Sequence, residues 1–412
     1  MNRWIRLGAA VVAMIMIANL QYSWTLFVKP IIAATNWKLS EVQWGFTFFI
    51  ALETWGMPFS GWLIDRIGPR VFMSIGGVLC GIGWASIGSV RTLHELYLSY
   101  GLAGAGASLI YCGSVGIALK WFPDKRGLAS GIVAAGFGGG AALFVPAFSR
   151  ILHTRPYSAV FLYSGILQGL VILCAAQLLS NPGADFAPLR AISSKSATLV
   201  RRHSEQFNSI EMLKTPHFYM LYLMMLMMGI GGLMVTAQVA PVASSLKIGA
   251  AALTLTVTLN SVANGLARLF WGWVSDHIGR ERAMIVAFTL QSVALMSVLT
   301  VGRLSTGAFV ACVFFVFFTW GEIYALFPPA AADFFGAANS SSNYSFLYSS
   351  KGVASIVAGG LAALLYEKSG SWNAAFYGSA ALALCAALLG LALRAMPLPQ
   401  KPAPALPEVV VE

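Results

Sequence analysis

The sequence predicts an all-α membrane protein with twelve transmembrane helices, arranged as two pseudo-symmetric six-helix halves. Three observations support this class. The composition is 58% hydrophobic and only 10% charged, whereas a soluble domain is about 25% charged. Apolar stretches of the length that spans a bilayer recur between residues 5 and 395 of the 412-residue chain. A short motif also recurs at corresponding places in the two parts of the chain, which indicates an internal repeat.

Twelve segments are long and apolar enough to be membrane helices. Six precede a long polar stretch and six follow it: 5–30, 41–63, 71–90, 95–119, 127–151 and 158–180, then 217–240, 249–274, 283–301, 305–328, 343–366 and 373–395. We therefore expect an N-terminal half over 1–180, a cytoplasmic linker over 181–216 and a C-terminal half over 217–395. The proline-rich tail 396–412 is expected to be disordered.

The basic residues predict the orientation. If both termini are cytoplasmic, sixteen Lys and Arg residues lie in inner segments and eight in outer ones, as the positive-inside rule requires. The rule also accounts for the net charge of +11, so we expect the lipid bilayer, and no nucleic acid, as the partner. A monomer is expected. Two basic residues, Arg268 and Lys351, fall in no loop.

The repeated motif follows the second and the eighth segment. It reads GWLIDRIGPR over 61–70 and GWVSDHIGRER over 272–282. A turn that carries a carboxylate beside guanidinium groups can hold helix ends together in one conformation and release them in another. We expect this gating role for Asp65, Arg66, Arg70, Asp276, Arg280 and Arg282; the alternative is a solvated loop that only obeys the positive-inside rule. The motif resembles the signature loop of the major facilitator superfamily, which implies that fold and a substrate site near the midplane.

Four charged side chains lie inside predicted membrane helices: Glu53, Arg268, Glu322 and Lys351. Such a charge costs about 2.5–3.5 kcal/mol on insertion scales and usually faces a cavity or pathway. Each is therefore a candidate functional residue.

Arg268 ends a polar stripe. Asn260, Asn264 and Arg268 are spaced four apart, so they share one helix face. The planar guanidinium can hold a carboxylate through two hydrogen bonds. The alternatives are an arginine that extends toward the cytoplasmic helix end and one that pairs with a membrane glutamate.

Lys351 lies in a second stripe, formed with Tyr344, Tyr348 and Ser355. The lysine is near half depth in its segment, where an outward path for the side chain is long. Tyrosine hydroxyls on the same face can donate to an anion. The alternative is a structural ion pair with Glu53 or Glu322.

Several stretches resemble the oxalate:formate antiporter family of bacteria, which is related to monocarboxylate transporters. They read QYSWTLF, YCGSVGIALKWFPDKRGLASG, NGLARLFWGWVSDHIGR, FFTWGEIYALFPPAAADFFG and NYSFLYSSKGVAS. The resemblance implies that Arg268 and Lys351 hold substrate carboxylates within a cage of Gln21, Tyr22, Tyr111, Trp320 and Tyr324. It also implies exchange of small carboxylate anions (oxalate, formate or monocarboxylates) by alternating access, in the bacterial cytoplasmic (inner) membrane.

This chain departs from that family at three positions. Tyr348 stands where the family has a tryptophan, and Glu53 and Glu322 replace uncharged residues. Two cations balance a dianion, whereas two cations and one ionised glutamate favour a monoanion or a proton carried with the anion. A proton-coupled monocarboxylate symporter for lactate or pyruvate, with Glu322 or Glu53 as proton carrier, is therefore the alternative function. We expect no enzyme, cofactor or metal, because the sequence lacks HExxH, nucleophile-elbow and nucleotide-loop motifs.

Overall fold

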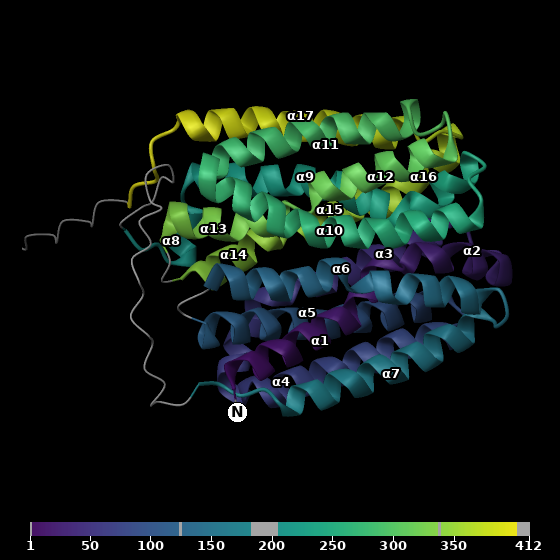
Figure 1. Ribbon diagram of the computed structural model, residues 1–412, viewed down its shortest axis with the longest axis horizontal. Coiled ribbons are helices and arrows are strands. Elements are labelled where there is room, and N and C mark those ends of the chain that lie inside the picture. Colours follow the sequence, from purple (N-terminus) through teal and green to yellow (C-terminus); the bar gives the residue numbers. More distant parts are fainter. Residues whose placement is uncertain (1, 123–125, 183–204, 337–338, 402–412) are drawn as a thin grey trace, which may run out of the picture.

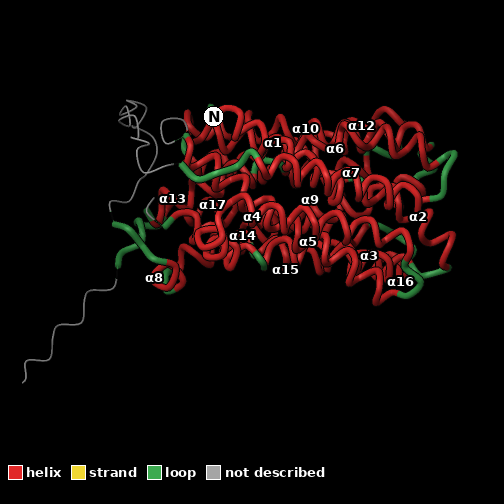
Figure 2. Tube along the Cα trace, turned by 90° about the horizontal axis from the view of Figure 1, so that it is seen from below, coloured by secondary structure: helices red, strands yellow, loops and turns green. Residues whose placement is uncertain are grey.

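The computed structural model describes residues 2–122, 126–182, 205–336 and 339–401. Figure 1 shows an elongated bundle in which the helices of residues 2–182 lie beside one another, below those of residues 205–401. Below, these two parts are called the N-terminal and the C-terminal segment. The helices run along the length of the bundle, and the loops gather at its two ends (Figure 2).

The N-terminal segment contains seven α-helices and one short 3-10 helix among its described residues. They are α1 (Arg3–Tyr22), α2 (Trp24–Thr35), α3 (Leu39–Trp55), α4 (Met57–Ser86), the short 3-10 helix η1 (Ile87–Ser89), α5 (Leu93–Trp121), α6 (Arg126–Leu152) and α7 (Tyr157–Gln177).

The C-terminal segment contains more and shorter helices. They are α8 (Ser209–Leu213), α9 (Pro216–Ser245), α10 (Ala250–Ile278), α11 (Arg280–Thr300), α12 (Thr306–Trp320), α13 (Ile323–Phe335), α14 (Ser340–Tyr348), α15 (Ser350–Ile356), the π-helical turn η2 (Val357–Leu361), α16 (Ala362–Ser369) and α17 (Asn373–Ala395).

Eleven helical stretches in the described ranges are long and apolar enough to cross a membrane. The predicted class, a multi-pass helical membrane protein, is thereby confirmed. The number of twelve stays a prediction, because segment 41–63 is divided at Gly56 and its longer piece, α3, has 17 residues. The pseudo-symmetric division into six-helix halves also stays a prediction.

Short interruptions occur within four predicted helices, 5–30, 41–63, 305–328 and 343–366; the last two still lie within single apolar stretches, Thr306–Phe335 and Ser342–Ser369. The interruptions fall at Ser23, Gly56, Gly321–Glu322 and Ser349. Pro58 follows the second one closely and has no N–H with which to continue the helix. At the fourth, the Ser349 hydroxyl donates to the Phe346 carbonyl at 2.6 Å and competes with the backbone ladder. Interruptions at membrane depth are tolerated where surrounding protein satisfies the backbone.

The repeat seen in the sequence extends to the backbone. Gly68 (φ 75°, ψ 159°) and Gly279 (φ 90°, ψ 155°) occupy the same place in the two copies of the motif and share one conformation. That region is essentially restricted to glycine. The recurring glycine is therefore explained by a recurring turn.

The linker and the tail meet at one end of the bundle. Lys401 Nζ forms an ion pair with Glu211, 3.1 Å from Oε2, and the Lys401 backbone N–H donates to Glu205 Oε2 at 3.2 Å. The beginning of the predicted disordered tail, up to Lys401, is therefore packed against the protein, because residues of the linker anchor it. Residues 183–204 of the linker and 402–412 of the tail lie outside the described ranges.

Candidate functional site

The helix interruptions lie beside predicted site residues. Helix α1 ends at Tyr22, α12 at Trp320 and α14 at Tyr348. Glu53 lies three residues before the interruption at Gly56. The ends of several helices therefore converge on one buried region of polar and aromatic side chains.

Lys351 forms a buried ion pair at this place. Its Nζ lies 2.8 Å from Glu53 Oε2, and the lysine and glutamate side chains are 1% and 0% exposed. Nζ also donates to Gln21 Oε1 at 3.0 Å and to the Tyr348 hydroxyl at 3.2 Å. The structure thus contains one of the two ion pairs that the sequence left open for Lys351, the one with Glu53.

Arg268 is bound to neutral groups. Its Nε and Nη2 donate to Asn264 Oδ1 at 3.2 and 2.9 Å, and its Nη1 donates to the Ala134 carbonyl at 2.6 Å. The guanidinium carbon lies 4.5 Å from the centre of the Tyr324 ring, a cation–π contact. Arg268 is 3% exposed, so its side chain does not extend outward to the helix end.

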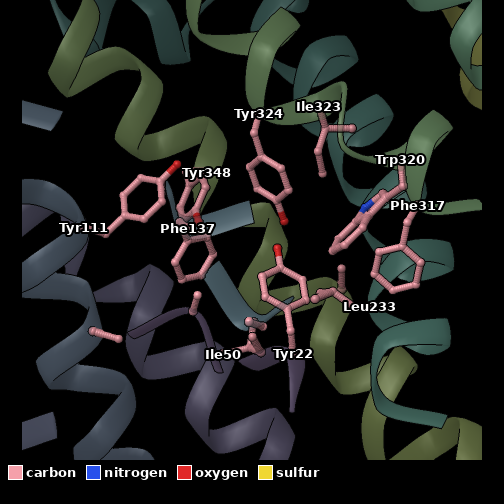
Figure 3. Close-up of a cluster of buried hydrophobic side chains, with 14 of the residues drawn as sticks. Tyr22, Ile50, Tyr111, Phe137, Leu233, Phe317, Trp320, Ile323, Tyr324 and Tyr348 are labelled. Atoms are coloured by element: carbon pink, nitrogen blue, oxygen red, sulfur yellow. The ribbon is translucent and has the colours of Figure 1, made fainter. Parts of the chain in front are cut away.

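Aromatic rings enclose the two cations. Lys351 Nζ also faces the Tyr324 ring, at 5.7 Å, and both cations lie within 6 Å of the Phe137 ring. Figure 3 shows Tyr22 and Tyr324 pointing toward each other, with Phe137 and Tyr348 to one side and Trp320 to the other. The predicted cage residues are thus brought together, each at most 5% exposed: Gln21, Tyr22, Tyr111, Trp320, Tyr324 and Tyr348.

Several buried donors in this enclosure have no hydrogen-bond partner among the described residues. They are Gln21 Nε2, Asn264 Nδ2, Trp320 Nε1 and the Tyr324 hydroxyl. Buried polar groups are nearly always paired, and all four can donate to an oxygen anion. The site is therefore equipped for a ligand rich in acceptors.

Glu322 does not join the cations. It is fully buried beside the α12–α13 interruption, and neither of its carboxyl oxygens has a hydrogen-bond partner among the described residues. Lys351 pairs with Glu53 instead. The two membrane glutamates therefore occupy different environments.

The end of the bundle where α3 begins is closed by polar contacts between the two segments. The Ser40 N–H and hydroxyl donate to the Glu367 carboxylate at 2.8 and 2.9 Å. Gln43 Nε2 donates to the Ala237 carbonyl at 2.8 Å and to Gln238 Oε1 at 3.1 Å. With its central residues buried, the site is shut off from this end.

The predicted gating residues are only partly described. Arg280 Nε lies 3.3 Å from Asp333 Oδ2, and its Nη1 donates to the Ser275 hydroxyl. Arg70 is exposed. The side chains of Asp65, Arg66 and Asp276 lie outside the described part of the chain. Asp333, which was not among the predicted gating residues, links the end of α13 to the beginning of α11.

Two site residues were missed from sequence. Phe137 faces both cations, and Gly138 lies directly beneath Arg268: a Cβ at Gly138 would lie 3.0 Å from Arg268 Nε and 2.7 Å from Asn264 Oδ1. The signal was a single large ring within the run AAGFGGG. A run of small residues indicates close helix packing. A large ring within such a run does not fit the helix contact and is expected to project into an adjacent space.

Comparison with known proteins defines the class of this helical membrane protein and then its family. The sequence model of the Major Facilitator Superfamily matches residues 9–240 and 219–410. The chain is 39% identical to the oxalate:formate antiporter of Oxalobacter formigenes over 91% of this chain and 87% of that protein. It is 28% identical to monocarboxylate transporter 13 of Rattus norvegicus, over 38% of this chain and 37% of that protein. It is 31% identical to monocarboxylate transporter 1 of Bos taurus, over 38% of this chain and 31% of that protein.

The chain is thus a multi-pass membrane transporter. It belongs to the major facilitator superfamily.

Proposed function

We propose that this protein exchanges small carboxylate anions across the bacterial cytoplasmic membrane by alternating access. The name of its 39% identical relative, an oxalate:formate antiporter, supports exchange of such anions. Two six-helix halves would move about the buried site, with both termini and the linker on the cytoplasmic side. The closed end at Ser40 and Glu367 would then be the outer gate.

One observation supports the proposal above all. Two cations from different helices, Arg268 of α10 and Lys351 of α15, face the same Tyr324 and Phe137 rings in a buried enclosure. An unpaired buried cation is costly, and a carboxylate supplies the countercharge through charge-assisted hydrogen bonds. Rings that exclude water strengthen that attraction.

The ion pair with Glu53 favours a second candidate, proton-coupled transport of a monocarboxylate. Glu53 neutralises Lys351, so Arg268 is the cation of the site that lacks a carboxylate partner in the described residues. One remaining positive charge matches a monoanion better than a dianion. A proton on Glu53 or Glu322 would restore the second positive charge or travel with the substrate.

Uptake into proteoliposomes tests both candidates. We expect labelled oxalate, formate, lactate or pyruvate to enter vesicles that contain an unlabelled anion of the same panel. Exchange that ignores an imposed pH gradient supports the first candidate. Uptake into vesicles without internal anion, driven by the pH gradient, supports the second.

Two variants test the site. Arg268→Ala is expected to abolish uptake, and Arg155→Ala, a change at an exposed arginine, is the matched control. Uptake by Arg268→Ala at the wild-type rate would remove this residue from the site. For the second candidate, Glu322→Gln should weaken the response to the pH gradient; an unchanged response would remove Glu322 as proton carrier.

A further inference from the structure

We propose that Glu53 takes the place of a substrate carboxylate on Lys351 when the site is empty, so that the carrier can close and return without cargo. The inference rests on the proposed function, because it concerns the same site. It predicts that the protein carries out net transport and is not restricted to one-for-one exchange.

The first argument is the number of donors on Lys351. A lysine ammonium has three N–H donors and no acceptor. All three have an acceptor within 3.2 Å: Glu53 Oε2, Gln21 Oε1 and the Tyr348 hydroxyl. A substrate carboxylate therefore reaches Lys351 only by displacing one of them. Glu53 is the one with the same chemistry as the substrate.

The second argument is where the partners come from. Glu53 is near the end of α3 in the N-terminal segment, and Lys351 is near the beginning of α15 in the C-terminal segment. The pair thus bridges the two segments and has to separate whenever α3 and α15 move apart. It can reform when they close again without cargo.

Neighbouring contacts show that α3 and α15 meet closely here. Trp55 Nε1 donates to the Ser349 carbonyl at 3.1 Å, and Thr47 Oγ1 donates to the Ser355 carbonyl at 2.9 Å. A Cβ at Gly352 would lie 2.5 Å from both Thr54 Oγ1 and Trp55 Nε1. The ion pair therefore lies within the contact between the two helices and becomes buried only when that contact is complete.

The third argument is the energy of the empty closed state. Burying an uncompensated charge is strongly unfavourable, which would hold an empty carrier open. The Glu53 carboxylate removes that cost for Lys351 without any substrate. The Arg268 guanidinium donates to Asn264 Oδ1 and to the Ala134 carbonyl and makes a cation–π contact with the Tyr324 ring. In the same closed state its charge is therefore stabilised by neutral groups.

The test compares net efflux with exchange in the wild-type protein. Proteoliposomes are loaded in turn with labelled oxalate, formate, lactate and pyruvate, and release is measured into buffer with and without unlabelled external anion. We expect release without external anion at a rate within about tenfold of exchange, since a tenfold ratio corresponds to only ~1.4 kcal/mol. Exchange with no measurable net efflux would overturn the inference but leave the proposed function intact. Absence of both would overturn the two together.

Variants of Glu53 test the cause. In Glu53→Gln the countercharge is lost, so the ratio of net efflux to exchange should fall at least about tenfold. Glu53→Asp keeps the charge and should give a higher ratio than Glu53→Gln. Glu41→Gln, at the other end of the same helix, where Glu41 caps α3, should keep the wild-type ratio. An unchanged ratio in Glu53→Gln, or an equal fall in Glu41→Gln, would contradict the inference.

Discussion

Lys351 and Arg268 are the two buried cations of the site, and their surroundings differ in kind. Lys351 has an ionic partner, Glu53, and its three donors all have acceptors. Arg268 has Asn264 and a backbone carbonyl as acceptors. The lysine is thus neutralised from within the protein, whereas the positive charge of the arginine is not.

This difference suggests a division of labour. A guanidinium that is held by neutral groups is fixed in position and can still attract an anion, so Arg268 suits the first contact with substrate. A lysine that already holds a carboxylate gains little from another anion unless Glu53 leaves. Lys351 therefore suits the coupling between substrate binding and the closure of α3 on α15.

The largest expected effect is a loss of thermal stability, and it should be larger for removal of Lys351 than for removal of Arg268. Lys351→Ala leaves the Glu53 carboxylate buried without its partner, and removal of one member of a buried pair costs about 3–5 kcal/mol. Arg268→Ala removes a cation that has no carboxylate partner among the described residues, so its cost should be smaller. Thermal unfolding of the purified protein in detergent should show a clearly lower melting temperature for Lys351→Ala.

The double variant Lys351→Ala/Glu53→Gln provides the control for that experiment. It removes both charges of the pair and should recover part of the lost melting temperature. If the two single variants unfold at the same temperature, or if the double variant recovers nothing, the contrast between the two cations is wrong.

An intermediate effect is expected when Arg268 is displaced without being removed. In Gly138→Ala the new Cβ would lie 3.0 Å from Arg268 Nε, so the guanidinium has to shift. Small misplacements of a binding group can weaken function strongly, and we expect the half-saturation concentration of transport to rise about tenfold. Gly139→Ala is the matched control, because the nearest atom to its Cβ, the Ser261 carbonyl oxygen, is 3.8 Å away. Equal behaviour of the two variants would argue against a fixed position for Arg268.

The sequence predicted the two cations but not their difference. Arg268 and Lys351 could be found because basic residues inside membrane helices are rare and are therefore conspicuous. The choice between Glu53 and Glu322 as partner of Lys351 could not be made, because it depends on how α3 lies against α15, far away in the chain. Membrane segments are predicted from the length of apolar stretches relative to the thickness of a bilayer. This criterion does not depend on backbone hydrogen bonding, so it could not predict where the helices are interrupted.

The smallest expected effect tests whether the donors of Lys351 are all occupied. Tyr348→Phe removes the hydroxyl that accepts from Nζ at 3.2 Å and keeps the ring and all formal charges. One lysine donor becomes free for a substrate oxygen. Because a single hydrogen bond contributes modestly, we expect the half-saturation concentration to fall by about threefold.

Tyr163→Phe is the control for this measurement, since the Tyr163 side chain is exposed on the outside of the bundle and is not part of the buried site. Its half-saturation concentration should stay at the wild-type value. A rise in Tyr348→Phe would show that the Tyr348 hydroxyl itself donates to the anion. In that case Lys351, like Arg268, would keep donors available for substrate while the protein is closed. The two cations would then differ only in that Lys351 has an ionic partner, Glu53.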